Sequence, residues 1–269
     1  MIPEQWLDSD YYPVPTVIEA AKALYEKHSV KEITRHDANI DETTTEIDRI
    51  IKHSKDNRRK SICFVTGVPG SGKTLVGLNI AISRSEGQGD RATYLSGNRP
   101  LVDVLVTALT KNYRDKLKEK GQKQTIEDKK KIKGISEMIK IIHQYRRYYN
   151  DNREAIPPEH IAIFDEAQRA WTYDRIKDFM ARKQNHPNFE YSEPEFLIQT
   201  MNRHHDWATI ICLVGGGQEI NYGEAGLPEW FDSLRRSFKD WDVYISPNLN
   251  DTEYCRQNSW GDITYGLNI

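Results

Sequence analysis

The chain has 269 residues, of which 38% are hydrophobic and 29% charged, a balance typical of a globular protein with a substantial core. No run of about eighteen apolar residues occurs, and the N-terminus lacks a basic start followed by an apolar stretch, so neither a membrane span nor a secretory signal is expected. The formal charge of −2 neither requires nor excludes a polyanionic partner.

Residues 13–54 predict two helices, which we assign to an N-terminal helical segment over residues 1–55. Apolar residues recur there at helical spacing. They are Val17, Ala20, Ala21 and Leu24 in the first helix and Ile47, Ile50 and Ile51 in the second. We expect either Asp41 or Thr43 to cap the second helix, because short polar side chains accept hydrogen bonds from the N–H groups at a helix start.

From Ser61 onwards, short buried strands alternate with helices. The predicted strands are 61–67, 91–97, 161–166, 208–216 and 241–246, and the predicted helices between them are 73–85, 99–113, 135–150, 173–183 and 194–205. Apolar strands separated by helices indicate an α/β fold with a doubly wound, mostly parallel sheet. We assign this domain to residues 56–250 and a C-terminal tail to residues 251–269.

Residues 111–134 form a basic insertion in this alternation, with ten Lys or Arg against four Asp or Glu and hence a local charge of +6. Two interpretations remain open: a solvated charged surface, or a site for the phosphate backbone of a nucleic acid. Because the whole chain is nearly neutral, a claim for nucleic-acid binding has to rest on such local charge.

Directly after the first strand of the sheet, "GVPGSGKT" at 67–74 matches the phosphate-binding pattern G-x-x-x-x-G-K-[ST] at every fixed position. Its glycines let the backbone curl so that N–H groups face phosphate oxygens, and the following helix adds the positive end of its dipole. Lys73 is expected to reach the β- and γ-phosphates, and the Thr74 hydroxyl to ligate Mg²⁺. The expected nucleotide-binding residues are Gly67, Pro69, Gly70, Ser71, Gly72, Lys73, Thr74 and Leu75.

The third strand of the sheet ends in two adjacent carboxylates, Asp165 and Glu166. Like charges at the end of a buried strand are costly, but ligands of such sheets gather at the carboxyl ends of strands, where a Mg²⁺–nucleotide complex would offset the charge. We therefore expect Asp165, next to the end of the strand that precedes Gly67, to serve the Mg²⁺ shell. Glu166 is expected to polarise the water that attacks the γ-phosphate. The alternative is that both acids merely cap the next helix. ATP is the expected nucleotide, since the N-K-x-D pattern that reads guanine is missing.

Four segments occur in the order of motifs I, Ia, II and III of superfamily 1 helicases: "GVPGSGKT", "YLSGNRPLVDVL", "IFDEAQRAW" and "CLVGGGQEINYGEAG". Over roughly residues 60–245 the chain thus resembles the first RecA-like domain of a superfamily 1 helicase-like P-loop ATPase. It is most similar to the uncharacterised bacterial helicase-like family related to the C-terminal helicase region of Schlafen proteins. The resemblance implies a RecA-like fold, hydrolysis of ATP with Mg²⁺, and single-stranded DNA or RNA as a partner.

The resemblance also implies roles for two glutamines. Gln168, in the D-E-x-Q form of motif II, would couple the nucleotide site to neighbouring motifs, and Gln218 would sense the γ-phosphate as the motif III glutamine. The family usually has a Gly-Asp pair before that glutamine, whereas this chain has Gly216 and Gly217. One acidic contact is therefore missing, and a flexible turn before a helix is the alternative interpretation of "GGGQE".

Motif Ia of the related helicases touches the nucleic-acid backbone, which implies that role here for Ser96, Asn98 and Arg99. The alternative is a strand-to-helix turn with a capping residue. The basic segment 111–134 lies between motifs Ia and II, where superfamily 1 helicases often insert an accessory nucleic-acid-binding subdomain.

Helicases of superfamily 1 bind ATP between two RecA-like domains, and the second supplies an arginine that stabilises charge on the transferred phosphate. Only fifteen residues follow Tyr254 in this chain, too few for that domain, so we expect a second RecA-like domain to act in cis or in trans. The predicted function is the ATPase core of a nucleic-acid-dependent motor, with Lys73, Glu166 and Gln218 as catalytic residues. The alternative is a nucleotide-dependent switch or scaffold that binds ATP with little hydrolysis and acts through a protein partner.

Several other polar residues have simpler interpretations. His204 and His205 end a predicted helix, and we interpret them as a polar helix end rather than metal ligands, because no Cys or carboxylate stands at ligand spacing. The tyrosines and arginines of residues 143–150 are expected to cover the sheet and extend their polar ends to water, with base stacking as the alternative. Three cysteines, an odd number without metal-ligand spacing, predict reduced thiols and a cytoplasmic location.

Overall fold

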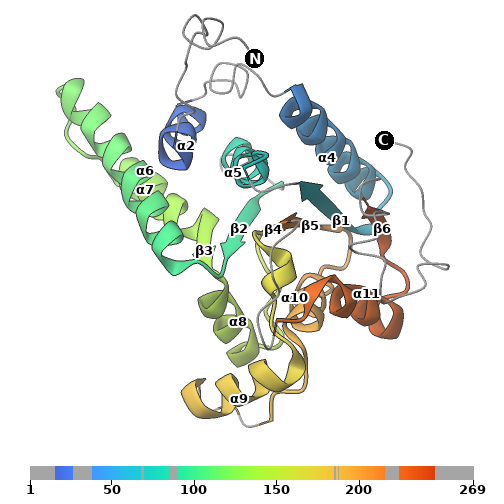
Figure 1. Ribbon diagram of the computed structural model, residues 1–269. Coiled ribbons are helices and arrows are strands. Elements are labelled where there is room, and N and C mark those ends of the chain that lie inside the picture. The colour runs from blue at the N-terminus through green and yellow to red at the C-terminus, as the bar shows by residue number, and fades with distance from the viewer. Residues whose placement is uncertain are drawn as a thin grey trace, which may run out of the picture.

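The computed structural model describes residues 16–26, 38–67, 70–84, 90–184, 186, 188–215 and 224–245. At its centre is a six-stranded sheet in the order β3-β2-β4-β5-β1-β6, in which every pair of neighbours is parallel (Figure 1). The strands are β1 (Lys60–Gly67), β2 (Ala92–Ser96), β3 (Ile139–Ile141), β4 (Ile161–Phe164), β5 (Ala208–Gly215) and β6 (Asp242–Ile245). This arrangement confirms the predicted α/β class and is consistent with a RecA-like, doubly wound fold.

Helices cover both faces of the sheet, because strand side chains alternate between the faces and both sets are apolar. On one face lie α2 (Val17–Tyr25), α4 (Ala38–Asp56), α5 (Lys73–Ser83), α6 (Arg99–Glu119) and α7 (Ile126–Met138); on the other lie α8 (Ile142–Asp151), α9 (Tyr173–Gln184), α10 (Glu193–Met201) and α11 (Gly226–Ser237) (Figure 1). Ile62 and Phe64 of β1 pack towards the second group, whereas Cys63 packs towards the first. None of the described helices is long and apolar enough to cross a membrane.

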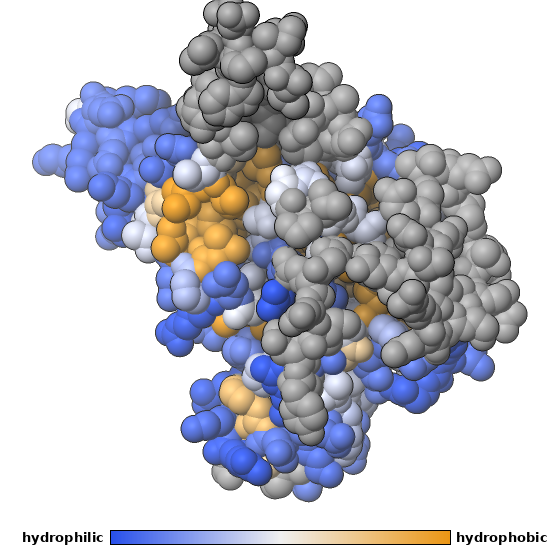
Figure 2. Space-filling model, viewed as in Figure 1, coloured by the Kyte–Doolittle hydropathy of each residue, from blue (hydrophilic) through white to orange (hydrophobic). Residues whose placement is uncertain are grey.

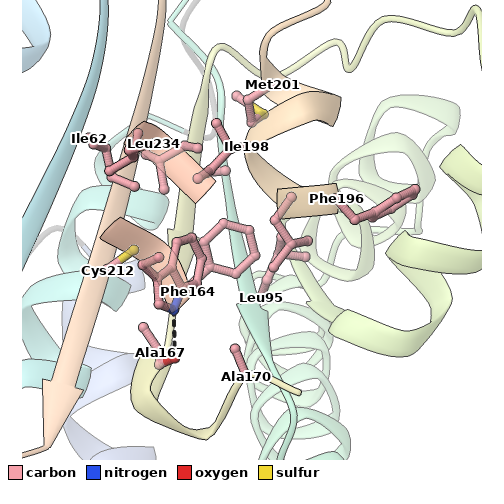
Figure 3. Close-up of a cluster of buried hydrophobic side chains, with 14 of the residues drawn as sticks. Ile62, Leu95, Phe164, Ala167, Ala170, Phe196, Ile198, Met201, Cys212 and Leu234 are labelled. Atoms are coloured by element: carbon pink, nitrogen blue, oxygen red, sulfur yellow. Dashed lines mark hydrogen bonds between the residues drawn. The ribbon is translucent and has the colours of Figure 1, made fainter. Parts of the chain in front are cut away.

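The core on the second face fixes the position of the chain that follows β4. Ile62, Leu95, Phe164 and Cys212 from four neighbouring strands meet Phe196, Ile198 and Met201 of α10 and Leu234 of α11 (Figure 3). In the same cluster, the fully buried Trp230 donates its indole N–H to Ala167 O at 2.9 Å (Figure 3). Ala167 begins the short 3₁₀ helix η1 (Ala167–Arg169), so α11 anchors the turn after the carboxylate strand.

The region 135–150, predicted as one helix, is instead a helix, a strand and a helix. α7 ends at Met138, β3 occupies Ile139–Ile141, and α8 begins at Ile142. A run of isoleucines suits both a helix and a strand, and pairing with β2 along the edge of the sheet decides between them.

The N-terminal helices differ from expectation only in detail. α4 starts at Ala38, so Asp41 and Thr43 lie inside the helix and do not cap it. The predicted apolar residues of both helices are buried, except for Val17, which is 40% exposed. Both helices therefore use the apolar face that their periodicity indicated.

The basic segment 111–134 is the outer part of a helical hairpin formed by α6 and α7. Tyr113 donates to Asp128 Oδ1 at 2.7 Å across the hairpin, and Asn112 donates to Glu26, just after α2, at 2.8 Å. Most of its lysines are exposed, and Figure 2 shows a hydrophilic surface over this part of the molecule, at the upper left. The segment is therefore continuous with two helices that cover the sheet.

Helix α5 approaches the sheet closely at Gly77. A Cβ added to Gly77 would lie 2.7 Å from Leu213 Cδ1, 3.1 Å from Ile163 Cγ2 and 3.1 Å from Tyr94 Cε2. These three side chains are themselves fully buried and have little room to move. The missing side chain at Gly77 therefore sets the distance between α5 and the sheet, and with it the position of the residues at the start of the helix.

We expect Gly77→Ala to destabilise the protein, although alanine is the better helix former by about 1 kcal/mol. Overpacking against three buried side chains costs roughly 1–3 kcal/mol, which leaves a net loss of up to about 2 kcal/mol. Gly134→Ala in α7 is the matched control, because its added Cβ meets nothing within 4 Å, and it should stabilise by about 0.5–1 kcal/mol. Thermal unfolding measures both, and a more stable Gly77→Ala protein would contradict the close approach of α5.

Candidate functional site

The loop between β1 and α5 depends on glycine backbone geometry. Gly70 and Gly72 have φ angles of +81° and +84°, in the left-handed region that residues with a Cβ rarely adopt. A Cβ on Gly67 would lie 2.4 Å from Ser71 Oγ and 3.3 Å from Ser71 Cβ, so Ser71 packs closely against the end of β1. The described part of the loop, residues 70–72, therefore has the backbone conformation that a cradle of N–H groups for phosphate uses. Pro69, predicted as part of this loop, lies outside the described residues.

The start of α5 has no capping side chain and no negative charge of its own. Gly72 occupies the N-cap position, and the first turn contains no acidic residue. The positive end of the helix dipole and the first N–H groups therefore face the loop. Leu75, also predicted to bind nucleotide, is 7% exposed and packs in the core, so only its backbone can face a ligand.

Lys73, the first residue of α5, directs its ammonium group back into the loop. Its Nζ donates to Gly67 O at 2.6 Å and lies 3.4 Å from Ser71 Oγ. Partial burial lowers the pKa of Lys73, while the negative charges of Glu166 and Asp165 act in the opposite direction. The lysine therefore lies within electrostatic reach of both carboxylates.

Asp165 directly follows β4, and its N–H donates to Leu95 O of β2 at 2.9 Å. The Thr74 hydroxyl lies 3.5 Å from Asp165 Oδ1, and the Ser96 hydroxyl lies 3.5 Å from Oδ2. Burial raises the pKa of Asp165 and the charge of Glu166 raises it further, while the neighbouring hydroxyl groups lower it. The contacts from Thr74 and Ser96 are long, and the Tyr94 hydroxyl also lowers the pKa, but burial still outweighs them, so the charge of this carboxylate is only partly compensated.

One strand separates β1, which precedes the glycine loop, from β4, which precedes the two carboxylates. The sequence suggested that Asp165 lies next to the end of β1, but β5 stands between β1 and β4. Neighbouring strands are about 4.8 Å apart, so the ends of β1 and β4 are about 10 Å apart. Thr74 reaches across because it lies on the helix that follows the loop.

Glu166 has a φ of +54°, which is rare for a residue with a side chain. Its Oε2 accepts a hydrogen bond from the Gln168 amide and pairs with the Arg169 guanidinium at 3.4 Å. Gln168 also accepts from the Gly215 N–H at 3.0 Å, at the end of β5. One glutamine thus joins Glu166 to the strand between β4 and β1. Gln218, three residues beyond that strand, lies outside the described residues, so its contact with a γ-phosphate stays a prediction.

The three residues predicted to touch nucleic acid have different surroundings. Ser96 is buried and its hydroxyl accepts from the Asn98 N–H at 3.2 Å, so burial argues against a direct contact with a nucleic acid. Asn98 caps α6, with Oδ1 accepting from the Leu101 N–H at 3.2 Å, which is the alternative that the sequence left open. Arg99 is exposed and lies 3.6 Å from Asp103.

A groove of about 500 Å³ extends from the two carboxylates along the chain after β4. Residues from several regions of the chain line it, among them Asn98, His143, Asp165, Glu166, Trp171 and Arg175. The Arg175 guanidinium lies over the Trp171 ring at 4.5 Å. The groove therefore combines acidic, aromatic and basic side chains beside the carboxylate pair.

Arg146 of α8 and Glu193 of α10 form a fully buried ion pair next to this groove. Glu193 Oε2 also accepts the Trp171 N–H at 2.9 Å, and the Arg146 guanidinium lies 5.1 Å from the Trp171 ring. The expectation that the arginines of 143–150 extend to water is therefore wrong for Arg146. No sequence signal could identify the pair, because its members are 47 positions apart and neither belongs to a motif.

The chain matches the family model described as "Schlafen group 3, DNA/RNA helicase domain" over residues 60–260, about three quarters of its length. The matched region begins with β1 and includes the glycine loop, the carboxylate pair and the end of β5. No curated protein matches the chain.

The raised pKa of Asp165 predicts that the nucleotide-free protein loses stability as pH rises from the ordinary value of 3.8 through the folded-state value. In that range the folded state binds the proton more tightly than the unfolded chain does. Asp165→Asn removes the charge and keeps the shape, so between about pH 4 and 7 its stability should fall less with pH than that of the parent. The exposed Asp103→Asn is the control and should behave like the parent. Thermal unfolding across this range measures the slopes, and identical slopes for parent and Asp165→Asn would contradict the buried charge.

Proposed function

The chain belongs to the Schlafen group 3 DNA/RNA helicase domain family, and from this membership we propose that it binds ATP with Mg²⁺ between the glycine loop and β4 and hydrolyses it to act on DNA or RNA. The family itself indicates a helicase-like role directed at nucleic acid. One observation carries the ATP part of the proposal. The helix that follows the glycine loop places the Thr74 hydroxyl 3.5 Å from the partly buried Asp165. Asp165 directly follows β4, which is not a neighbour of β1.

The geometry of the loop supports phosphate binding. Backbone N–H groups around Gly70 and Gly72, together with the uncapped start of α5, are suited to an anion. Lys73 would exchange its bond with Gly67 O for a bond with a phosphate oxygen. Because burial lowers the pKa of Lys73, added negative charge from phosphate would favour its charged form.

Thr74 and Asp165 are the residues that would hold Mg²⁺, since hydroxyl and carboxylate oxygens are the ligands this ion prefers. When bound, the ion would neutralise charge on the phosphate groups. Asp165 suits this role because its charge is buried and weakly compensated, so a nearby cation would relieve the cost that its raised pKa reflects. Ser96, 3.5 Å from the other carboxylate oxygen, would keep Asp165 oriented.

Glu166 is the proposed general base for the attacking water. Its left-handed backbone conformation sets its side chain apart from that of Asp165, and Gln168 holds its carboxylate. Since Gln168 also binds the end of β5, a rearrangement there would reach Glu166 directly. Gln218, further along the same segment, is the proposed sensor of the γ-phosphate. A second RecA-like domain, in cis or in trans, would add an arginine worth about 10³- to 10⁵-fold in rate.

A specific contact favours the second candidate function, a nucleotide-dependent switch or scaffold. One oxygen of this proposed base, Glu166 Oε2, is already engaged by both Gln168 and Arg169. If these contacts persist with ATP bound, hydrolysis would be slow and the bound nucleotide would act by reshaping a surface for a protein partner. The two functions differ in their turnover.

We expect Glu166→Gln to lower ATP turnover by about 10²- to 10⁴-fold, the usual contribution of a positioned base, while leaving ATP affinity nearly unchanged. Lys73→Ala should instead weaken ATP binding by at least about 10-fold, because it removes a charged hydrogen bond to phosphate. ATP hydrolysis and equilibrium binding are measured on both variants, with and without single-stranded DNA and RNA.

The pattern of results separates the two functions. A motor should hydrolyse faster with nucleic acid present and lose that response in Glu166→Gln. A switch should show little turnover even in the parent. Unchanged ATP affinity in Lys73→Ala would show that the nucleotide binds elsewhere, and it would contradict both the motor and the switch.

The exposed lysines of the α6–α7 hairpin are the proposed contact for a nucleic-acid backbone. Replacing Lys129 and Lys130 with glutamine should weaken binding to single strands and reduce the slope of log K against log salt by up to about 1.4, or 0.7 per phosphate contact. The matched control replaces the exposed Lys52 and Lys239, which lie away from the hairpin. Equal affinities and slopes for both double variants would leave the hairpin as a solvated surface.

A further inference from the structure

Three potential metal ligands meet at the amino-terminal ends of β4 and β5, opposite the end of the sheet that holds the glycine loop. The two strands run side by side from Ile161 and Thr209 onwards, and the Thr209 N–H donates to His160 O at 2.8 Å. His160, the residue before β4, therefore lies next to the turn before β5. That turn contains His204 and Asp206.

The ligand atoms of His160, His204 and Asp206 all lie within 4.8 Å of one another. His160 Nε2 is 3.3 Å from Asp206 Oδ1. Ligands on a tetrahedral Zn²⁺ at about 2.0–2.1 Å are about 3.3–3.4 Å apart, so this pair already has the spacing of two zinc ligands. The Asp206 side chain is 52% exposed and can rotate to complete the set.

The Nδ1 atom of His204 has a lone pair available to bind a metal ion. The other nitrogen, Nε2, faces Glu159 O at 3.1 Å, and because a carbonyl only accepts, Nε2 carries the hydrogen and Nδ1 has the lone pair. A metal-ligating histidine usually has its second nitrogen held by such a partner. His204 is also 4% exposed, so its orientation is fixed by packing.

The His160 ring is held from both sides. Its centroid lies 4.7 Å from that of Trp207 and 4.2 Å from that of His204. Its Nδ1 is buried without a hydrogen-bond partner among the described residues. The nitrogen that would bind an ion is the other one, Nε2, which lies 3.3 Å from Asp206, and the two neighbouring rings fix its orientation.

We propose that His160, His204 and Asp206 bind a divalent transition-metal ion such as Zn²⁺, with water as the fourth ligand. Two imidazoles and one carboxylate suit zinc and the neighbouring transition metals, whereas Mg²⁺ prefers surroundings made of oxygen alone. The ion would tie the start of β4 to the turn before β5 and so stabilise the sheet. The nucleotide site lies at the other ends of these strands, so either proposal can fail without the other.

His204 and His205, expected to end a helix, lie beyond α10, which ends at Met201, and the two residues have different surroundings. His205 is exposed and outside the cluster, while His204 is inside it. One further ligand, Asp206, is close in sequence, but His160 is 46 positions before Asp206 and comes near only through the pairing of β4 with β5.

Calorimetric titration of Zn²⁺ into the nucleotide-free full chain tests the site. Every sample carries Cys255→Ser, since the other two cysteines are buried and this thiol could bind zinc by itself. The parent should bind Zn²⁺ with 1:1 stoichiometry. Asp206→Asn and His160→Gln should each weaken binding by at least about 10-fold, because even the outer partners of metal ligands contribute that much. His205→Ala is the matched control and should bind like the parent.

Thermal unfolding gives a second readout. Zn²⁺ at about 100 times its Kd should raise the unfolding midpoint of the parent and of His205→Ala by about 5–10 °C. With binding weakened at least about 10-fold, Asp206→Asn should show at most about half of this rise at the same Zn²⁺ concentration. Its exposed position makes a folding defect easy to exclude by comparing the midpoints without metal. Absence of 1:1 binding in the parent would overturn the proposal, and so would binding that survives both Asp206→Asn and His160→Gln.

Discussion

The Asp165 carboxylate is the charge around which this site is organised. It follows a strand whose four residues are all buried, and the hydroxyls of Thr74 and Ser96 approach it only to 3.5 Å. Removing a carboxylate from water costs free energy unless other groups replace the lost hydration. Asparagine would fill the same position without that cost. The cost of this aspartate would be offset by a bound cation, which is the role we propose for it, so the proposed chemistry and the stability of the domain depend on the same charge.

The order of the strands sets where the Asp165 carboxylate lies relative to the glycine loop. Because β5 lies between β1 and β4, the glycine loop and the carboxylates face each other across the width of a strand instead of touching. The end of β5 is connected to Glu166 by the Gln168 side chain, which accepts from Gly215 and donates to the carboxylate. Three segments that are remote in sequence thus converge on one space, and Gly77 lets the helix after the loop pack closely enough to take part.

Patterns between near neighbours in the chain predicted most of the fold. The apolar strands 61–67 and 161–166 and the glycine spacing of 67–74 are local features. The first strand formed where it was predicted, and the second formed over Ile161–Phe164, with Asp165 and Glu166 in the turn that follows. β3 was missed because Ile139–Ile141 suits two structures and only the edge of β2 selects one. The insertion of β5 and the pairing of Arg146 with Glu193 depend on contacts between remote segments, which no periodicity records. The position of Lys73 near Asp165 could be anticipated only because parallel strands gather their carboxyl ends at one edge.

The buried pair of Arg146 and Glu193 also constrains how this domain can diverge. Loss of either partner would leave an unpaired charge in the interior, at a cost of roughly 3–5 kcal/mol, whereas exchange of both for apolar residues can be nearly neutral. Glu193 further holds the backbone of Trp171, so a change at either position would also shift a wall of the groove. Across homologous sequences we therefore expect positions 146 and 193 to covary, although they lie on different helices.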